Sequence, residues 1–234
     1  MERYKKEDKT SYTLGMSLTI EALKNHPDKL FQIVLSNKAI KNQQLEYLLS
    51  LADINNIDVV YDDKIIDKLS LKENCYCIGF INKYQSELSS NKHILLYEFN
   101  DYGDLGTILR SAVSFDFKDI VLINSNIDYF DPRCIRASMG GIFHCNIVKY
   151  TDIDTYLNDY PKQKIYPFLS KGSKELSDCL IDENYSLLIP ENYYALDNKF
   201  DDGYYIKHHN LDEISLAIRS SIIFEYVYNQ KRNR

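Results

Sequence analysis

Apolar and polar residues alternate in short blocks along the chain, and the spacing within each block predicts whether it is a helix or a strand. In the first 84 residues, helical spacing predicts helices over 17–24, 43–51 and 64–69. Apolar runs between them predict strands over 30–35, 57–61 and 75–81. Because helices and strands take turns, we expect this part of the chain to be a small α/β sandwich.

The alternation continues after a polar stretch, 85–92, whose composition is typical of a linker. Further strands are expected over 93–99, 118–124, 142–148, 165–169, 186–189 and 204–207. Further helices are expected over 107–115, 132–138 and 211–228. Repeated strand–helix–strand passes predict a mainly parallel sheet, because parallel neighbours need a crossover connection. We therefore expect an α/β fold with a small domain over 1–84 and a second domain over 93–234.

The last expected helix carries an apolar stripe that is broader than one buried face requires. The stripe consists of Leu211, Ile214, Ala217, Ile218, Ile222, Ile223, Phe224 and Val227. We expect this helix to pack on the sheet and also on a partner subunit.

Composition limits the partners and the compartment. The formal net charge is −6, so a nucleic acid would have to bind a local basic patch rather than the field of the whole molecule. The five cysteines are scattered, which is typical of reduced thiols in a cytosolic protein. The charged amino terminus and the lack of a long apolar run predict a cytoplasmic protein with no membrane partner.

Candidate chemistry begins where the strand over 93–99 ends and a helix follows. Asn100, Gly103, Gly106 and Arg110 lie in this junction, and such junctions are where open α/β sheets hold ligands. The glycines would allow a tight turn and a close approach to a ligand, and Asn100 could cap the helix. A capped turn followed by a solvated arginine is the alternative interpretation.

A second cluster follows within the expected helix over 132–138. Pro132 is suited to the first turn of that helix, and a glycine at 140 or 141 to its end. Arg133 and Arg136 are one turn apart on one face, beside Ser138, and paired arginines suit a phosphate group.

These two clusters resemble the first two motifs of the SpoU (TrmH-like) family of RNA ribose 2′-O-methyltransferases, in the SPOUT superfamily. The resemblance lies in residues 100–110, 128–132 and 136–140. It extends to residues 12–15 and 72–79, which resemble the amino-terminal substrate-binding domain of some family members, so the resemblance implies that residues 1–84 bind the RNA substrate. The resemblance implies a trefoil-knotted carboxyl-terminal domain, S-adenosylmethionine as cofactor, RNA as substrate, and a homodimer.

The resemblance also implies roles for individual residues. Catalytic roles fall on Asn100, Arg110 and Ser215, and RNA binding on Arg133, Arg136 and Ser138. The family assigns deprotonation of the ribose hydroxyl to the arginine that matches Arg110. A guanidinium has a pKa above about 12, so we interpret Arg110 instead as an organiser of the target phosphate and hydroxyl. Recognition of a 2′-hydroxyl favours RNA over DNA.

The third motif departs from the family pattern. The loop over 188–196 has no glycine, and the last helix opens with Leu211, Asp212 and Glu213 where the family has Ser-Leu-Asn. The bulky side chains of Tyr193 and Tyr194 could fill the pocket that the resemblance implies for S-adenosylmethionine. The positions implied for cofactor binding are Leu169, Ile189, Pro190, Glu191, Ile206 and Leu216.

Two hypotheses follow from the sequence. One is an active 2′-O-methyltransferase that acts on ribosomal or transfer RNA. The other is a non-catalytic homodimer that binds RNA but not S-adenosylmethionine. His208 and His209 have no further ligands at metal spacing, so we expect an exposed loop there rather than a metal site.

Overall fold

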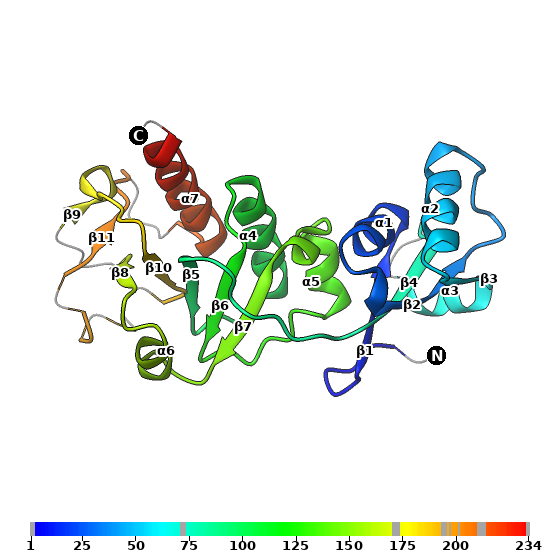
Figure 1. Ribbon diagram of the computed structural model, residues 1–234, viewed down its shortest axis with the longest axis horizontal. Coiled ribbons are helices and arrows are strands. Elements are labelled where there is room, and N and C mark those ends of the chain that lie inside the picture. The colour runs from blue at the N-terminus through cyan, green and yellow to red at the C-terminus, as the bar shows by residue number, and fades with distance from the viewer. Residues whose placement is uncertain are drawn as a thin grey trace. The chain divides into compact units, whose positions relative to one another are not determined.

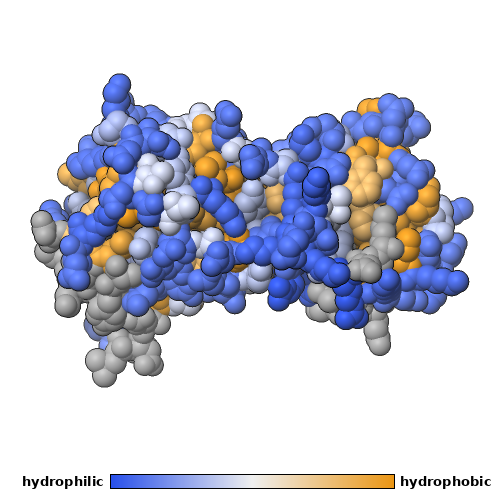
Figure 2. Space-filling model, turned by 90° about the horizontal axis from the view of Figure 1, so that it is seen from below, coloured by the Kyte–Doolittle hydropathy of each residue, from blue (hydrophilic) through white to orange (hydrophobic). Residues whose placement is uncertain are grey.

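The structure is a computed structural model, and it describes residues 3–70, 74–169, 174–192, 196, 198–200, 202–209 and 214–232. Contacts between residues divide the chain into two compact units (Figure 1). Unit 1 contains residues 1–84 and 128–144, and unit 2 contains residues 85–127 and 145–234. The face drawn in Figure 2 is mostly hydrophilic, with smaller apolar areas in both units.

Unit 1 is built around a four-stranded sheet with the order β1-β4-β2-β3. Its strands are β1 (Thr10–Leu14), β2 (Leu30–Leu35), β3 (Asp58–Tyr61) and β4 (Cys77–Asn82). Its first helices are α1 (Met16–Asn25), η1 (Pro27–Lys29), α2 (Gln43–Ile54) and α3 (Asp63–Leu69). β4 runs antiparallel to β1 and β2, whereas β3 runs parallel to β2. The expected α/β sandwich is confirmed, although β1 escaped prediction because its sequence is largely polar.

Side chains at the helix starts and one glycine in the sheet explain the local structure of unit 1. Asn42 accepts a hydrogen bond from the Leu45 amide and so caps α2. Asp62 caps α3 in the same way. A Cβ on Gly79 would lie 2.7 Å from Cγ2 of Thr19, so α1 can approach β4 only where the strand has no side chain.

The segment 128–144 belongs to unit 1 by its contacts, whereas the sequence placed it within a continuous domain over 93–234. It contains α5 (Pro132–Ala137) and η2 (Gly141–His144). α5 packs against β1, and Ser11 Oγ donates to the carbonyl of Phe130. Pro132 opens α5 as predicted. The strand expected from residue 142 was wrong at its start, because Met139 and Gly140 have positive φ and turn the chain into η2.

Unit 2 has a five-stranded sheet with the order β7-β6-β5-β10-β8, in which every pairing is parallel. Its strands are β5 (Lys92–Tyr97), β6 (Asp119–Ile123), β7 (Asn146–Tyr150), β8 (Lys164–Pro167) and β10 (Tyr185–Pro190). Two short strands, β9 (Lys174–Glu175) and β11 (Tyr204–Tyr205), pair separately. The mainly parallel sheet predicted from the sequence is confirmed.

Helices cover both faces of this sheet. They are α4 (Tyr102–Ser114), α6 (Ile153–Asp159), η3 (Leu176–Asp178) and α7 (Leu216–Arg232). Tyr156 of α6 packs with Leu95, Val121 and Leu188 of the sheet. α4 and α7 contact each other and lie on the other side in Figure 1. The sheet is therefore buried on both faces, as its continuous apolar strands require.

A buried polar network ties the amino ends of the strands in unit 2 together. The Tyr156 hydroxyl lies 2.7 Å from Nδ1 of His93 and 2.7 Å from Oγ of Ser186. Asp119 accepts hydrogen bonds from the Ser90 amide at 2.7 Å and from Nδ2 of Asn146 at 2.7 Å. These bonds satisfy polar groups that would otherwise be costly to bury.

Within the described ranges, none of the helices combines the length and the apolar character that crossing a bilayer requires. Across the same residues, no group of three or more His, Cys, Asp or Glu side chains is arranged to hold a metal ion.

Candidate functional site

The candidate site in unit 2 lies where β5, β10 and β8 end at the carboxyl edge of the sheet. The Glu191 amide donates to the carbonyl of Tyr97 at 3.0 Å, so β5 and β10 stay paired to their last residues. Immediately afterwards Glu98 adopts a φ of 55°, and Asn124 after β6 has a φ of 49°. Asn124 Nδ2 donates to Oε1 of Glu98 at 3.1 Å. Such left-handed residues cost roughly 1–2 kcal/mol each, and they turn the chain sharply out of the sheet.

The turn leads into α4, whose capping residue differs from the prediction. Asp101, not Asn100, caps the helix by accepting from the Asp104 amide at 2.7 Å. Asn100 instead donates to the carbonyl of Glu98 at 3.3 Å. Gly103 and Gly106 lie inside α4 and have no positive φ, so their predicted role in a tight turn was wrong.

Arg110 is exposed in the third turn of α4, on the same face as Thr107 and Ser114. It is eight residues beyond the helix start, or about 12 Å along the axis at 1.5 Å per residue. Asn100 precedes that start, and the contact described for its side chain is with Glu98. Ser215 is also exposed, just before α7. The catalytic roles of Asn100, Arg110 and Ser215 stay predictions.

The second cluster belongs to unit 1. Arg133 pairs with Asp131 through two bonds, from Nε at 2.9 Å and from an Nη at 2.8 Å. Arg136 is half-buried on the same helix. Ser138 is buried, donates to the Ile135 carbonyl at 2.8 Å and accepts from the Ile142 amide at 3.3 Å. These contacts give Ser138 a structural role at the end of α5, and they offer no support for its predicted contact with RNA.

The positions implied for a cofactor are mostly buried in unit 2. The side chains of Leu169, Ile189 and Leu216 are at most 4% exposed. Pro190 is buried, Ile206 is half-buried and Glu191 is exposed. The Leu169 amide donates to the Tyr204 carbonyl at 3.0 Å, which joins the segment after β8 to β11.

A glycine in this region marks a close approach between two chain segments. A Cβ on Gly203 would lie 2.9 Å from the carbonyl oxygen of Pro167 and 3.0 Å from Cδ1 of Leu169. The two segments can therefore pack together only with a glycine at this position. Tyr193, Tyr194, Leu211, Asp212 and Glu213 lie outside the described residues.

One residue of this site, Arg219 in α7, was missed from the sequence. Its side chain is buried, and the residue is only 3% exposed. One Nη donates to the carbonyl of Pro190 at 3.1 Å and to the carbonyl of Glu191 at 2.9 Å. A charge is rarely buried without such partners. The signal in the sequence is an arginine spaced with Leu216 and Ile223 along the stripe of α7 that faces the core.

The parallel sheet, with polar and left-handed residues where its strands end, defines unit 2 as an α/β unit of the class in which ligands bind at the carboxyl ends of the strands. Residues 91–190 match the family model of the SpoU rRNA Methylase family. This part of the chain is therefore a SpoU-family domain, and the resemblance noted in the motifs is confirmed.

Curated relatives agree with this family over parts of their length. The mitochondrial rRNA methyltransferase 3 of Mus musculus is 38% identical over 61 residues, which are 26% of this chain and 15% of that protein. A 23S rRNA guanosine 2′-O-methyltransferase of Bacillus subtilis (strain 168) is 20% identical over 147 residues, or 59% of each chain. The matched segments thus span less than two thirds of these relatives.

Solved structures share the fold over nearly the whole chain. An rRNA methyltransferase from Sinorhizobium meliloti superposes with a TM-score of 0.78 at 18% identity, covering 95% of this chain and 88% of that one. The SpoU methyltransferase AviRb from Streptomyces viridochromogenes, in complex with the cofactor AdoMet, gives 0.79 at 13% identity, covering 96% and 91%. At such low identity the likeness shows the fold.

Proposed function

We propose that this protein is an RNA methyltransferase that transfers a methyl group from S-adenosylmethionine to a ribose 2′-hydroxyl of ribosomal or transfer RNA. The observation that carries the proposal is the SpoU-family match over residues 91–190, which includes the β5–α4 junction and Arg110. The B. subtilis relative is named as a 2′-O-methyltransferase of 23S rRNA, which supports the ribose as the target.

The residues at the carboxyl edge of the sheet fit an adenosine cofactor in their chemistry. Leu169, Ile189 and Leu216 are buried apolar residues near the strand ends, of the kind that an adenine ring would contact. Glu191 is exposed beside the buried Pro190, so the edge of this region is open to solvent. When bound, S-adenosylmethionine supplies a methyl group on a positively charged sulfur. The close approach of Gly203 to Pro167 and Leu169 would hold these two chain segments together at the site.

The side chains of the site would act mainly by positioning. Methyl transfer to a hydroxyl gains most from alignment of the acceptor oxygen and from removal of its proton. A guanidinium is a poor base, so Arg110 would hold the RNA phosphate and the hydroxyl rather than take the proton. Its exposed position on α4, beside the exposed Thr107, leaves it accessible to a large substrate.

An exposed apolar groove between α4 and α7 supports the predicted homodimer. It has a volume of about 410 Å³, and its apolar lining is Phe115, Ala217, Ile218 and Ile222. Ile218 is 56% exposed and Ile222 is 36% exposed. We propose that a second copy covers this groove, that the chain forms the trefoil knot implied by the family, and that the protein acts in the cytoplasm.

The proposal is tested by incubating total RNA with the protein and S-adenosylmethionine labelled in the methyl group. We expect label on a ribose 2′-oxygen, and mapping of that position identifies the RNA. Arg110→Ala should abolish the label, whereas Ser114→Ala, a control on the same face of α4, should retain it. Label on a base would contradict the proposal, and so would label that survives Arg110→Ala.

A specific observation favours a second candidate, the non-catalytic homodimer that binds RNA. Arg219 already occupies the carbonyls of Pro190 and Glu191, which are two of the positions implied for the cofactor. Calorimetry with millimolar S-adenosylmethionine separates the candidates. Heat of binding supports the enzyme, and its absence together with retained RNA binding supports the second candidate.

A further inference from the structure

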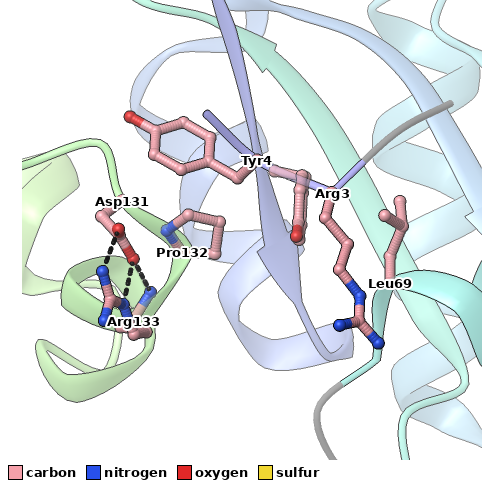
Figure 3. Close-up of a pocket in the computed structure, with 7 residues that line it drawn as sticks. Arg3, Tyr4, Leu69, Asp131, Pro132 and Arg133 are labelled. Atoms are coloured by element: carbon pink, nitrogen blue, oxygen red, sulfur yellow. Dashed lines mark hydrogen bonds and ion pairs between the residues drawn. The ribbon is translucent and has the colours of Figure 1, made fainter. Parts of the chain in front are cut away.

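Unit 1 has a small cavity that lies between the amino-terminal segment, the end of α3 and the start of α5 (Figure 3). Its volume is about 180 Å³, and its lining residues are Arg3, Tyr4, Tyr12, Leu69, Asp131, Pro132 and Arg133. Figure 3 shows Arg3 and Arg133 on opposite sides of the cavity, with Pro132 between them. Two guanidinium groups therefore flank an otherwise largely apolar and aromatic space.

Tyr4, which follows Arg3 in the chain, is held by a partly buried polar cluster. The Tyr4 hydroxyl donates to Oδ2 of Asp128, and Nζ of Lys83 lies 4.6 Å from the centre of the Tyr4 ring. Lys83 also pairs with Asp128 at 2.7 Å, and it donates to the Lys6 carbonyl at 2.9 Å. The Tyr4 side chain and the backbone that follows it are thereby held in place, next to Arg3 at the cavity.

Arg133 is positioned from the other side by Asp131. The carboxylate of Asp131 is only 7% exposed, and it accepts two hydrogen bonds from the guanidinium and one from the Arg133 amide. The Arg133 side chain is nevertheless 61% exposed. The two bonds to Asp131 hold the guanidinium plane in one orientation, so Arg133 can meet a ligand at little entropic cost.

The charge and the size of the cavity identify the ligand class. Two arginines and one aspartate give the lining a formal charge of +1, which matches one phosphodiester group. The volume of about 180 Å³ lies below the 300–1,000 Å³ typical of pockets for free small molecules. The cavity therefore suits one group that projects from a longer ligand.

We propose that this cavity binds one nucleotide of a single-stranded RNA segment, with its phosphate between Arg3 and Arg133. Tyr12, Pro132 and Leu69 would contact the adjoining sugar or base, since aromatic and apolar faces accept any base. The choice of RNA rests on the proposed function, and the cavity deepens it by giving unit 1 a defined contact with the substrate.

The test measures binding of a short labelled single-stranded RNA by fluorescence anisotropy, without cofactor, between about 50 and 200 mM salt. Arg3→Met and Arg133→Met should each weaken binding about five- to tenfold and reduce the salt slope by about 0.7, the value for one lost phosphate contact on a single strand. Lys38→Met removes an exposed charge elsewhere in unit 1 and should change neither quantity. Circular dichroism checks that each variant is folded.

The outcomes separate the cavity from the proposed function. If the wild type binds and methylates RNA but neither arginine variant weakens binding, the cavity assignment is overturned while the methyltransferase stands. If RNA binding depends on both arginines but no methyl transfer occurs, the cavity stands and the enzyme proposal fails. Competition by free mononucleotide at concentrations equal to those of the RNA would overturn the preference for a strand, and failure of the wild type to bind any RNA would overturn the cavity assignment.

Discussion

Replacement of Arg219 by methionine tests whether this buried arginine stabilises the end of β10. The change retains an unbranched apolar stem and removes the donor that Pro190 and Glu191 share. A buried carbonyl left without a donor costs about 1–3 kcal/mol, so two carbonyls set an upper limit of about 6 kcal/mol. Two effects reduce this figure. Glu191 is exposed, so water can replace the donor at its carbonyl, and removal of a buried charge also removes its desolvation cost.

We therefore expect Arg219→Met to lower the free energy of unfolding by about 1–3 kcal/mol. We also expect faster hydrogen exchange at the Glu191 amide, which bonds to the Tyr97 carbonyl at the end of the sheet. Denaturant unfolding gives the first quantity and exchange measured by NMR the second. Arg232→Met, at an exposed position on the same helix, should change neither.

Unchanged or increased stability in Arg219→Met would refute this reasoning, because it would mean that burial of the charge costs at least as much as its two bonds return. Tighter binding of S-adenosylmethionine by the same variant would show that the arginine blocks the site instead of shaping it. Arg219→Lys adds a check on the donor, since both bonds come from one guanidinium nitrogen and an ammonium group also carries enough donors for two carbonyls.

Two further predictions concern the dimer and the response to pH. Ile218→Glu should convert the proposed dimer to a monomer in sedimentation analysis, whereas Ile54→Glu, on an exposed residue of unit 1, should leave its mass unchanged. Burial lowers the pKa of His93, although its bond to the Ser90 carbonyl and the nearby Asp119 act in the opposite direction. Below the ordinary pKa of about 6.5, His93 of the unfolded chain therefore binds a proton that the folded chain does not bind. The free energy of unfolding should fall as the pH is lowered below that value. His93→Asn should flatten this dependence in unfolding curves between about pH 6.5 and 5, and an equally steep curve would contradict the assignment.

The sequence predicted the fold class because hydrophobic spacing is a local property. The parallel sheet of unit 2 follows from continuous apolar strands that alternate with helices, and the structure confirms it. Elements with a mixed pattern escaped prediction. β1 is rich in threonine, serine and tyrosine, and α6 contains two aspartates and is capped by a third, Asp152. The sequences of β1 and α6 alone do not indicate their secondary structure, which depends on the residues that they pack against.

The site was harder to predict because its residues act through distant partners. Asn100 and Asp101 are neighbours of similar capping propensity, and only the backbone geometry selects Asp101 as the cap. Arg219 meets carbonyls nearly thirty residues earlier in the chain, a contact that no local pattern shows. Asp128 binds Tyr4 and Lys83 in the same way across long intervals.

Unit 1 is discontinuous in sequence, since it contains residues 1–84 and 128–144, and this affects how the unit can be exchanged between genes. Its β1 strand packs on α5, which is encoded inside the gene segment for the neighbouring unit. A single recombination point near residue 85 would separate the sheet from the helix that covers it. A transfer of residues 1–84 alone would therefore leave behind the helix that packs on β1.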